Sequence, residues 1–209
     1  AKTIKWSMQG DSLTLDPHAQ NEGPTTQVSR QVYEALVQRG LDMKIGPALA
    51  KSWKATDPNT WIFTLREDVK FSDGSAMTSN DVVFSVLRAK QRTSDFKEYI
   101  STISGVEAIG DYSVKIITSK PNPILLNQLS NIFIMSKAWS EENFAMSPQN
   151  WDAGQETYSA TNALGTGPFK ITLREPNTKT VFKRNKHWWG EMTDKKVTQI
   201  ELLPIKNAA

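Results

Sequence analysis

The sequence offers only two imidazole side chains, His18 and His187, for acid–base or metal chemistry. A Ser-His-Asp arrangement needs a serine and an acid beside one of them, and no G-x-S-x-G elbow supplies the serine. No H-x-x-H pair or carboxylate cluster has the spacing of metal ligands, and cysteine is absent. His18 follows a proline in a predicted turn and His187 precedes two tryptophans, so structural roles are favoured for both. We therefore predict no catalytic residues, no metal site and no cofactor.

Three other groups of residues resemble parts of active sites. Gly165-Thr166-Gly167 has the glycines of a phosphate loop, but it lacks the Lys-Ser/Thr pair and the following helix. Asp73 and Asp81 lie in a predicted turn and a predicted helix cap, and these roles account for both carboxylates. Trp188 and Trp189 could form a platform for a sugar, but packing at the end of a strand is favoured. None of these groups predicts catalysis.

Length and composition indicate a globular protein with a sizeable core. The chain has 209 residues, of which 38% are hydrophobic and 22% are charged, and its formal net charge is +3. Basic and acidic residues are interleaved, which argues against a nucleic-acid partner. No apolar run reaches the ~20 residues that cross a bilayer. No basic and apolar leader precedes the first strand, so if the protein is secreted we expect this form to have lost its signal peptide.

Residues 61–88 contain the clearest local signals. The alternation WIFTL at 61–65 predicts a strand, and SDG at 72–74 predicts a turn. Thr78 and Asp81 have the spacing of a capping box, in which each side chain accepts a backbone N–H bond at the start of a helix. Apolar residues then recur at helical spacing. The segment therefore predicts a strand, a tight turn and a capped helix.

The rest of the chain alternates strands with a few helices and polar turns. Helices are predicted from Thr25 or Thr26 to Gly40, at 123–129 and at 137–143. The polar segment 145–164 is the best linker candidate. Extended segments are predicted at 4–8, 13–17, 48–55, 103–109, 113–118, 132–135, 169–173, 180–183 and 197–203.

Six blocks of sequence, in order, resemble the signature of the family 5 extracellular solute-binding proteins. These are the dipeptide, oligopeptide, nickel and opine receptors of ABC importers. The longest block is W-x-F-x-L-R-x-x-V-x-F-x-D-G from Trp61, which T-x-x-D-V-x-F-S from Thr78 follows. The other blocks are DPH at 16–18, VYEALV at 32–37, PALAKSW at 47–53, GTGPF at 165–169 and N-x-x-WWG at 185–190.

The resemblance implies an α/β fold of the periplasmic binding protein type II kind. The N-terminal lobe, a mixed sheet with helices, would be built from residues 1–43 and 160–209. A smaller β-rich domain, residues 44–159, would be inserted between these two segments. Family members are much longer, so the second large lobe would be missing and the chain would be the N-terminal portion of a truncated receptor.

The resemblance also places candidate ligand-binding residues in loops that would face a cleft between two lobes. Asn21, Glu22 and Gly23 match the family's ligand-facing loop by position. Glu22 could pair with a ligand ammonium, or it could be a solvated loop acid. Phe96 falls where related receptors place an aromatic wall, and Asn131, just before a predicted strand, is the last candidate.

Three further positions bear on the ligand. The loop from Gln9 to Asp11 is a weaker candidate, and Ser130 accompanies Asn131. Thr93 lies where nickel receptors carry a basic residue. The loss of that base argues against an anionic nickel chelate as the ligand.

For function, the resemblance implies capture of a solute without chemical conversion. The chain would bind a peptide, an opine or a similar amine-bearing solute in the periplasm and deliver it to the membrane subunits of an ABC importer. As a truncated receptor it would bind ligand weakly or not at all, and its exposed lobe surface would favour self-association. Two alternatives stay open: a stand-alone interaction domain derived from the receptor lobe, and a hydrolase, for which the sequence shows no nucleophile–base pair.

Overall fold

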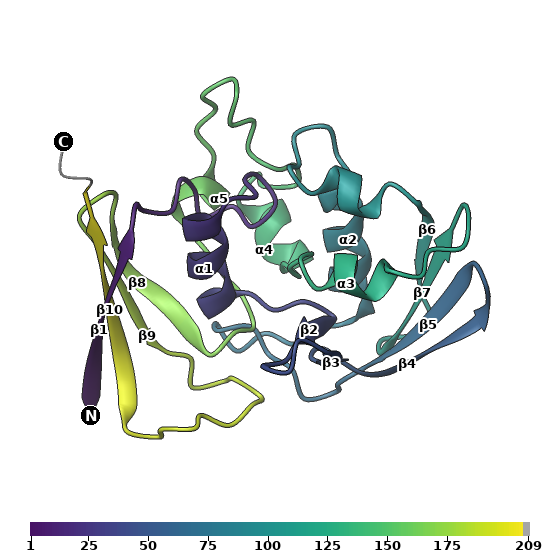
Figure 1. Ribbon diagram of the computed structural model, residues 1–209, viewed down its shortest axis with the longest axis horizontal. Coiled ribbons are helices and arrows are strands. Elements are labelled where there is room, and N and C mark those ends of the chain that lie inside the picture. Colours follow the sequence, from purple (N-terminus) through teal and green to yellow (C-terminus); the bar gives the residue numbers. More distant parts are fainter. Residues whose placement is uncertain (207–209) are drawn as a thin grey trace.

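Two four-stranded sheets and one short hairpin organise the chain (Figure 1). The computed structural model describes residues 1–206. One sheet has the strand order β1-β10-β9-β8, the other has the order β4-β5-β7-β6, and β2 pairs with β3. The strands are β1 (Lys2–Gln9), β2 (Val37–Arg39), β3 (Ile45–Pro47), β4 (Ala50–Asp57), β5 (Thr60–Leu65), β6 (Ile103–Ala108), β7 (Ser113–Thr118), β8 (Phe169–Glu175), β9 (Lys179–Arg184) and β10 (Val197–Ile205).

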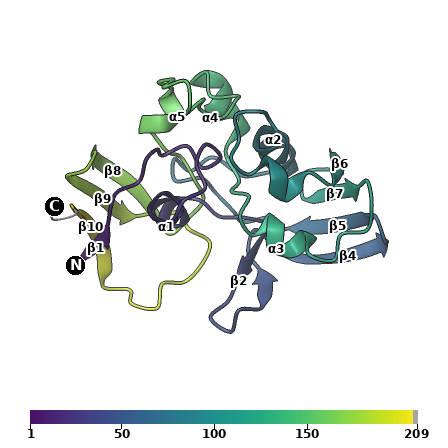
Figure 2. The ribbon, with the colours of Figure 1, turned by 45° about the horizontal axis from the view of Figure 1, so that its top comes forward.

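The helices are short and lie between and over the two sheets (Figure 2). They are α1 (Gly23–Val32), α2 (Ser79–Ala89), α3 (Leu125–Leu129), α4 (Lys137–Glu142), α5 (Tyr158–Thr161) and the 3-10 helix η1 (Lys97–Ile100). Within residues 1–206, none of them combines the length and the apolar character needed to cross a membrane.

The first sheet joins the two ends of the chain. β1 runs parallel to β10, with Trp6 opposite Leu202, and β10, β9 and β8 follow as antiparallel neighbours. Parallel neighbours need a long connection, and here nearly the whole chain lies between them. Phe182 and Leu202 are buried on this sheet and share a core with Val28 of α1. The extended segments predicted at 169–173 and 180–183 are confirmed as β8 and β9, which pair as an antiparallel hairpin.

The second sheet is built from the middle of the chain. β5 is central, and the predicted strand at 61–65 is confirmed. Its inward residues Phe63 and Leu65 are fully buried with Val82 and Val86 of α2. The spacing of these two valines places them on one face of the helix, which explains why α2 lies against this sheet.

The predicted capping box at the start of α2 is confirmed. The backbone N–H of Thr78 donates to Oδ2 of Asp81 at 2.8 Å, and Oδ1 of Asp81 accepts from the backbone N–H of Lys137 at 2.9 Å. Burial raises the pKa of Asp81, and the two backbone donors oppose that rise. Asp81 therefore fixes the start of α2 and the start of α4 together.

The helix predicted from Thr25 or Thr26 to Gly40 was wrong in its extent, because α1 begins at Gly23, with Glu22 as its N-cap, and ends at Val32. The carbonyls of Ala35 and Leu36 accept from the backbone N–H groups of the 49–50 segment at 3.2 and 2.9 Å. The Val32 carbonyl accepts from the N–H of Gly167 at 2.8 Å. Partners distant in sequence therefore take the carbonyls that a longer helix would have used.

Two predicted extended segments do not form strands. At 13–17, the N–H of Leu15 donates to the Ala160 carbonyl at 2.9 Å, and the N–H of His18 donates to Oδ1 of Asp16 at 3.0 Å, which closes a turn. At 132–135, the N–H of Met135 donates to the Ser85 hydroxyl at 2.7 Å. Because these backbone N–H groups donate to a loop carbonyl and to side-chain oxygens, they are not available for the hydrogen bonds of a sheet.

The segment at 145–164, predicted to be a linker between domains, is more ordered than its polar sequence indicated. It carries α5, and Gln149 and Ser159 are buried within it. The C-terminal strand extends through Pro204 to Ile205, past its predicted end at 203. The division into residues 1–43 plus 160–209, with residues 44–159 inserted, stays a prediction.

Candidate functional site

A buried ion pair lies beneath the loops at one edge of the molecule. Arg88 of α2 donates from Nη1 to Oδ1 of Asp16 at 2.8 Å and from Nη2 to Oδ2 at 2.7 Å. Neither side chain is exposed to solvent. Burial alone would raise the pKa of Asp16, but the charge and the hydrogen bonds of Arg88 outweigh it and hold that pKa below its usual range. The pair is therefore ionised in the folded protein.

His18 completes this buried unit. Its Nδ1 lies 2.9 Å from Nη1 of Arg88, and its Nε2 lies 2.8 Å from the carbonyl oxygen of Phe133. Because the guanidinium only donates, the imidazole must accept at Nδ1 and donate from Nε2. Burial, followed by the charge of Arg88, lowers the pKa of His18 to about 4. The histidine is thus neutral near pH 7, and both of its ring nitrogens are engaged within the chain.

Arg88 and Asp16 also form hydrogen bonds with the segment at 145–159. Arg88 donates from Nε to the Ala145 carbonyl and from Nη2 to the Ser147 carbonyl, each at 3.0 Å. Asp16 accepts at Oδ2 from the Gln149 N–H at 3.0 Å and from the Ser159 hydroxyl at 2.8 Å. A single ion pair therefore holds three distant segments of the chain in one place.

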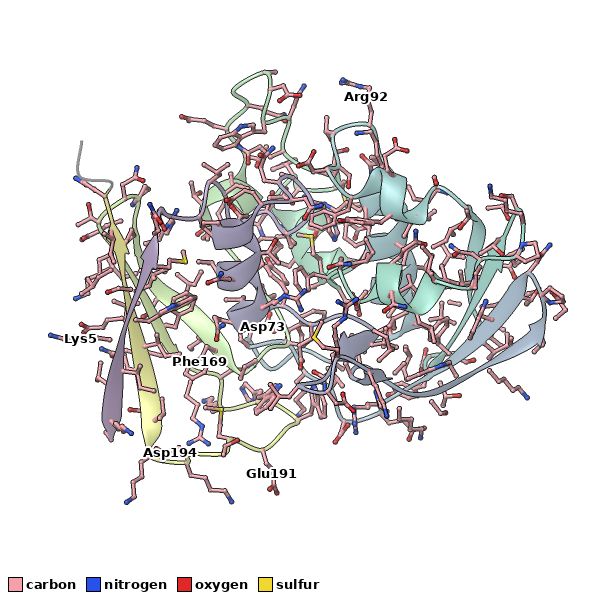
Figure 3. All side chains as sticks on the ribbon, in the orientation of Figure 1. Lys5, Asp73, Arg92, Phe169, Glu191 and Asp194 are labelled. Carbon is pink, nitrogen blue, oxygen red and sulfur yellow. The ribbon has the colours of Figure 1, made fainter. Side chains whose placement is uncertain are left out.

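We call the outer surface of these segments the loop face, and define it as residues 10–23, 91–96, 145–161 and 174–177. It lies at the N-terminal end of α1, and Arg92 marks it in Figure 3. Two hollows open on it, with volumes of about 660 and 520 Å3. Leu13, Gln149, Trp151, Tyr158 and Arg174 help to line the larger one, and Arg92, Thr93 and Pro148 the smaller one.

The larger hollow has a hydrogen-bonded polar base and an apolar rim. Arg174 donates from Nη1 to both carboxylate oxygens of Asp11, at 2.9 and 2.8 Å, and Asp11 also accepts from the N–H of Asn177 at 2.7 Å. Trp151 is 37% exposed and Tyr158 is 46% exposed. Such exposed aromatic side chains over a satisfied polar base are suited to contact with an organic ligand.

The predicted residues Asn21, Glu22 and Gly23 lie together at the start of α1. Asn21 donates from its backbone N–H to Oδ2 of Asp95 at 2.9 Å and from Nδ2 to the Tyr99 hydroxyl at 3.2 Å. Glu22 is the N-cap of the helix, and its carboxylate accepts from the backbone N–H of the residue three positions on at 2.7 Å. Its pairing with a ligand ammonium stays a prediction.

The other two predicted residues have different surroundings. Phe96 is only 2% exposed and contacts the ring of Tyr99, with ring centroids 5.9 Å apart. Asn131 donates from Nδ2 to the Asn127 carbonyl at 3.2 Å, beyond the end of α3. Thus Asn21 and Phe96 are brought together through Tyr99, and within residues 1–206 no hydrogen bond joins Asn131 to either of them.

Sequence reasoning missed several residues of the loop face. The DPH block at 16–18 was recognised, but nothing in the sequence indicated that Arg88 would be its partner. Trp151 and Tyr158 lie in the segment that had been predicted to be a linker. Thr93 donates to the Pro148 carbonyl at 2.8 Å and lines the smaller hollow, and its correspondence to the basic residue of nickel receptors stays a prediction.

Glu34 and the two adjacent tryptophans form a second polar cluster. The indole N–H groups of Trp188 and Trp189 donate to Glu34 at 3.2 and 2.9 Å, and the Thr166 hydroxyl donates to it at 2.8 Å. Arg66 lies 4.0 Å over the ring of Trp189. The indoles are therefore held by hydrogen bonding and stacking within the chain.

No group of three or more histidines and acids in the described part of the chain could hold a metal ion. The family model for bacterial extracellular solute-binding proteins, family 5, middle region, matches residues 44–209. The chain belongs to this family.

Two curated proteins similar to this chain are named as binding proteins. The chain is 28% identical to the periplasmic murein peptide-binding protein MppA of Escherichia coli K12, over 95% of this chain and 38% of that protein. It is 31% identical to the nickel-binding periplasmic protein of the same organism, over 91% of this chain and 35% of that protein.

A solved structure shows the same fold. The periplasmic binding protein AgaA from A. tumefaciens R10, in complex with agropinic acid, matches with a TM-score of 0.85 and 24% identity. The match covers 98% of this chain and 40% of that one. The mixed α/β fold is therefore that of family 5 periplasmic binding proteins. The chain spans about 40% of the length of its relatives.

Proposed function

We propose that this chain is part of the substrate-binding component of an ABC importer, which captures a peptide, an opine or a similar amine-bearing solute in the periplasm. Membership of family 5 carries the proposal. The names of its relatives, which include peptide-binding and nickel-binding periplasmic proteins, support it. In this proposal the protein binds without converting the ligand, and membrane subunits of the importer receive it.

The loop face supplies one wall of the ligand site. Its two hollows, the exposed rings of Trp151 and Tyr158 and the N-terminal end of α1 lie on the same edge of the molecule. We assign the Asn21–Gly23 segment to direct contact with ligand, and Phe96 to support of that wall from below through Tyr99. Asn131 is a separate candidate at the end of α3. The residues that complete the site lie in the additional length that the relatives have.

The domain division belongs to the same proposal. Residues 1–43 and 160–209 would form one lobe, because β1, β8, β9 and β10 share one sheet. Residues 44–159 would form the inserted domain, because β4 to β7 share the other. The inserted domain would move with its lobe, because the buried unit of Asp16, His18 and Arg88 joins the two.

The 209-residue chain on its own is expected to bind weakly and to self-associate. Several large apolar side chains are exposed on or beside the loop face, and a contiguous apolar surface favours association. They are Leu13, Phe144, Met146, Trp151 and Tyr158. Sedimentation at rising concentration tests the association, and a strict monomer throughout would contradict it.

Calorimetry tests the proposed function. The whole protein and the 209-residue chain are titrated with panels of di- to pentapeptides and opines, and product formation is monitored alongside. We expect saturable binding of at least one class by the whole protein, no conversion of ligand, and a much weaker response from the 209-residue chain. Turnover, or equally tight binding by the 209-residue chain, would contradict the proposal.

A further inference from the structure

A third hollow, of about 260 Å3, opens at the C-terminal end of α1. We call it the arginine pocket and define it by Arg30, Glu34, Arg39, Ser130, Phe133 and Trp188. None of these residues lines either hollow of the loop face. Because α1 starts at the loop face and the arginine pocket lies by its last turn, the two sites are at opposite ends of this helix (Figure 1).

The charge of Arg30 is not paired with an acid in the described part of the chain. Its guanidinium carbon lies 5.7 Å from the centroid of the Phe133 ring, so the side chain rests on an aromatic face. Within residues 1–206 it makes no ion pair and no hydrogen bond through the guanidinium. All of its N–H donors are therefore available to a ligand.

Arg39 presents a second guanidinium to the same hollow from β2. Its Nη2 donates to the side-chain oxygen of Asn127 at 3.2 Å, a neutral partner that leaves the charge of Arg39 uncompensated. Both arginines are exposed to solvent at the mouth of the hollow. Burial and the nearby positive charge of Arg39 both lower the pKa of Arg30. Two like charges thus share one concave site, and an anion between them would relieve the repulsion.

Glu34 is the one acid that lines this hollow, and its oxygens are already engaged. They accept hydrogen bonds from Trp188, Trp189 and Thr166. No ion pair joins Glu34 to either arginine in the described chain. The favourable effect of the helix dipole on a cation in the last turn accounts for the position of Arg30 but not for that of Arg39.

We propose that the arginine pocket binds a compact oxyanion, a phosphate or carboxylate group, held between the guanidinium groups of Arg30 and Arg39. The planar, multi-donor guanidinium suits both groups, because it can donate two parallel N–H bonds to one of them. The ring of Phe133 supplies an apolar wall beside the anion. The hollow is smaller than the ~300 Å3 at which drug-sized ligand sites begin, so a small group fits and a peptide does not.

The test uses inorganic phosphate and acetate as separate probes, at constant ionic strength set with sodium chloride. Side-chain N–H resonances of the arginines are followed by NMR, together with the midpoint of thermal unfolding. We expect saturable shifts for Arg30 and Arg39 with at least one probe, and a rise in the midpoint because the anion binds only the folded protein. The probe that binds more tightly identifies the chemistry of the group.

Variants assign the response to the two arginines. Arg30→Gln and Arg39→Gln should each weaken anion binding at least tenfold. Arg30→Lys should keep part of the affinity, because lysine keeps the positive charge but lacks the paired, planar N–H donors of the guanidinium. Lys5→Gln, on β1 and outside both the arginine pocket and the loop face, removes one positive charge as the control and should bind as the parent does (Figure 3). Circular dichroism without anion confirms that each variant is folded. Absence of saturable shifts in the parent, or binding that survives in both glutamine variants, would overturn the proposal. The test does not depend on the proposed import function, since it needs no transported solute.

Discussion

Arg88 and Asp16 form a two-bonded ion pair in which neither side chain is exposed to solvent, although 72 positions separate them in the sequence. The pair joins the loop after β1 to a helix that packs on the other sheet. The remaining donors of Arg88 hold two carbonyls of the segment at 145–159. The shape of the loop face therefore depends on this pair. We expect the protein to lose stability when either partner is replaced.

Replacement of Arg88 by methionine should lower the free energy of unfolding by about 3–5 kcal/mol, because the Asp16 carboxylate would be left buried without its cation. Urea unfolding measures the change. The Asp16→Asn and Arg88→Met double variant should cost less than the sum of the two single variants, since neither charge is then left alone. Additive losses would show that the two residues are not coupled.

His18 should make stability depend on pH above the range in which most carboxylates titrate. Its pKa is about 4 in the folded protein against 6.5 for an unperturbed histidine, so between these values the unfolded state binds more protons. The contribution of neutral His18 to the free energy of unfolding is complete above pH 6.5. It is lost as the pH falls toward 4, and the total loss is roughly 3 kcal/mol. Burial raises the pKa values of Glu34 and Asp81, which act in the opposite direction.

A variant isolates this effect from the other groups. His18→Gln can keep a donor and an acceptor but does not titrate, so the slope of stability against pH between 6.5 and 5 should be smaller than in the parent. Unfolding in urea across that interval provides the measurement. Equal slopes in the two proteins would mean that His18 is protonated in the folded state as readily as in the unfolded one.

Gly165 is required by the close approach of two backbone segments. A Cβ atom at this position would lie 2.1 Å from the carbonyl oxygen of Val32, which also accepts the hydrogen bond of Gly167. Gly165→Ala should therefore destabilise the protein by about 1–3 kcal/mol, the typical cost of forcing extra atoms into a packed site. Gly46→Ala is the matched control, because no atom lies within 4 Å of its added Cβ. Equal thermal midpoints for the two variants would contradict this account.

Glu22 permits a test that separates helix capping from ligand binding. Glu22→Asn replaces one N-cap by another, so the unfolding free energy should change by less than about 1 kcal/mol. If the carboxylate anchors a ligand ammonium, the same change should cost about 1.5–3 kcal/mol of binding energy in the whole protein. Glu22→Asp, which keeps both cap and charge, is the control. Unchanged affinity in Glu22→Asn would leave Glu22 with the capping role alone.

Much of the fold could be predicted because its signals are local. The alternation at 61–65 and the side chains of Thr78 and Asp81 specify a strand and a helix start from adjacent residues. The end of α1 could not be predicted, because Gly167, 135 positions away, takes the carbonyl of Val32. The strand predicted at 13–17 does not form for a similar reason, since the backbone N–H of Leu15 donates to the Ala160 carbonyl and that of Leu13 donates to the Thr25 hydroxyl.

The candidate site was predictable only in part. The resemblance placed Asn21 to Gly23 just before the first predicted helix. The structure puts them on the loop face at the start of α1, where Glu22 and not Thr25 or Thr26 is the N-cap. The aromatic rim of Trp151 and Tyr158 gave no signal, because polar, irregular sequence surrounds both residues. Their positions depend on Arg88, and pairing between distant charges has no signature in one sequence.

Hydrogen exchange on the whole protein, with and without a ligand found by calorimetry, tests the central claim most directly. If the loop face is a wall of the solute site, amides in residues 10–23, 91–96 and 145–161 should exchange more slowly when ligand is bound, while amides of the β4–β5 hairpin should not change. Protection confined to other parts of the protein, with these three segments unaffected at saturation, would contradict the assignment of the loop face.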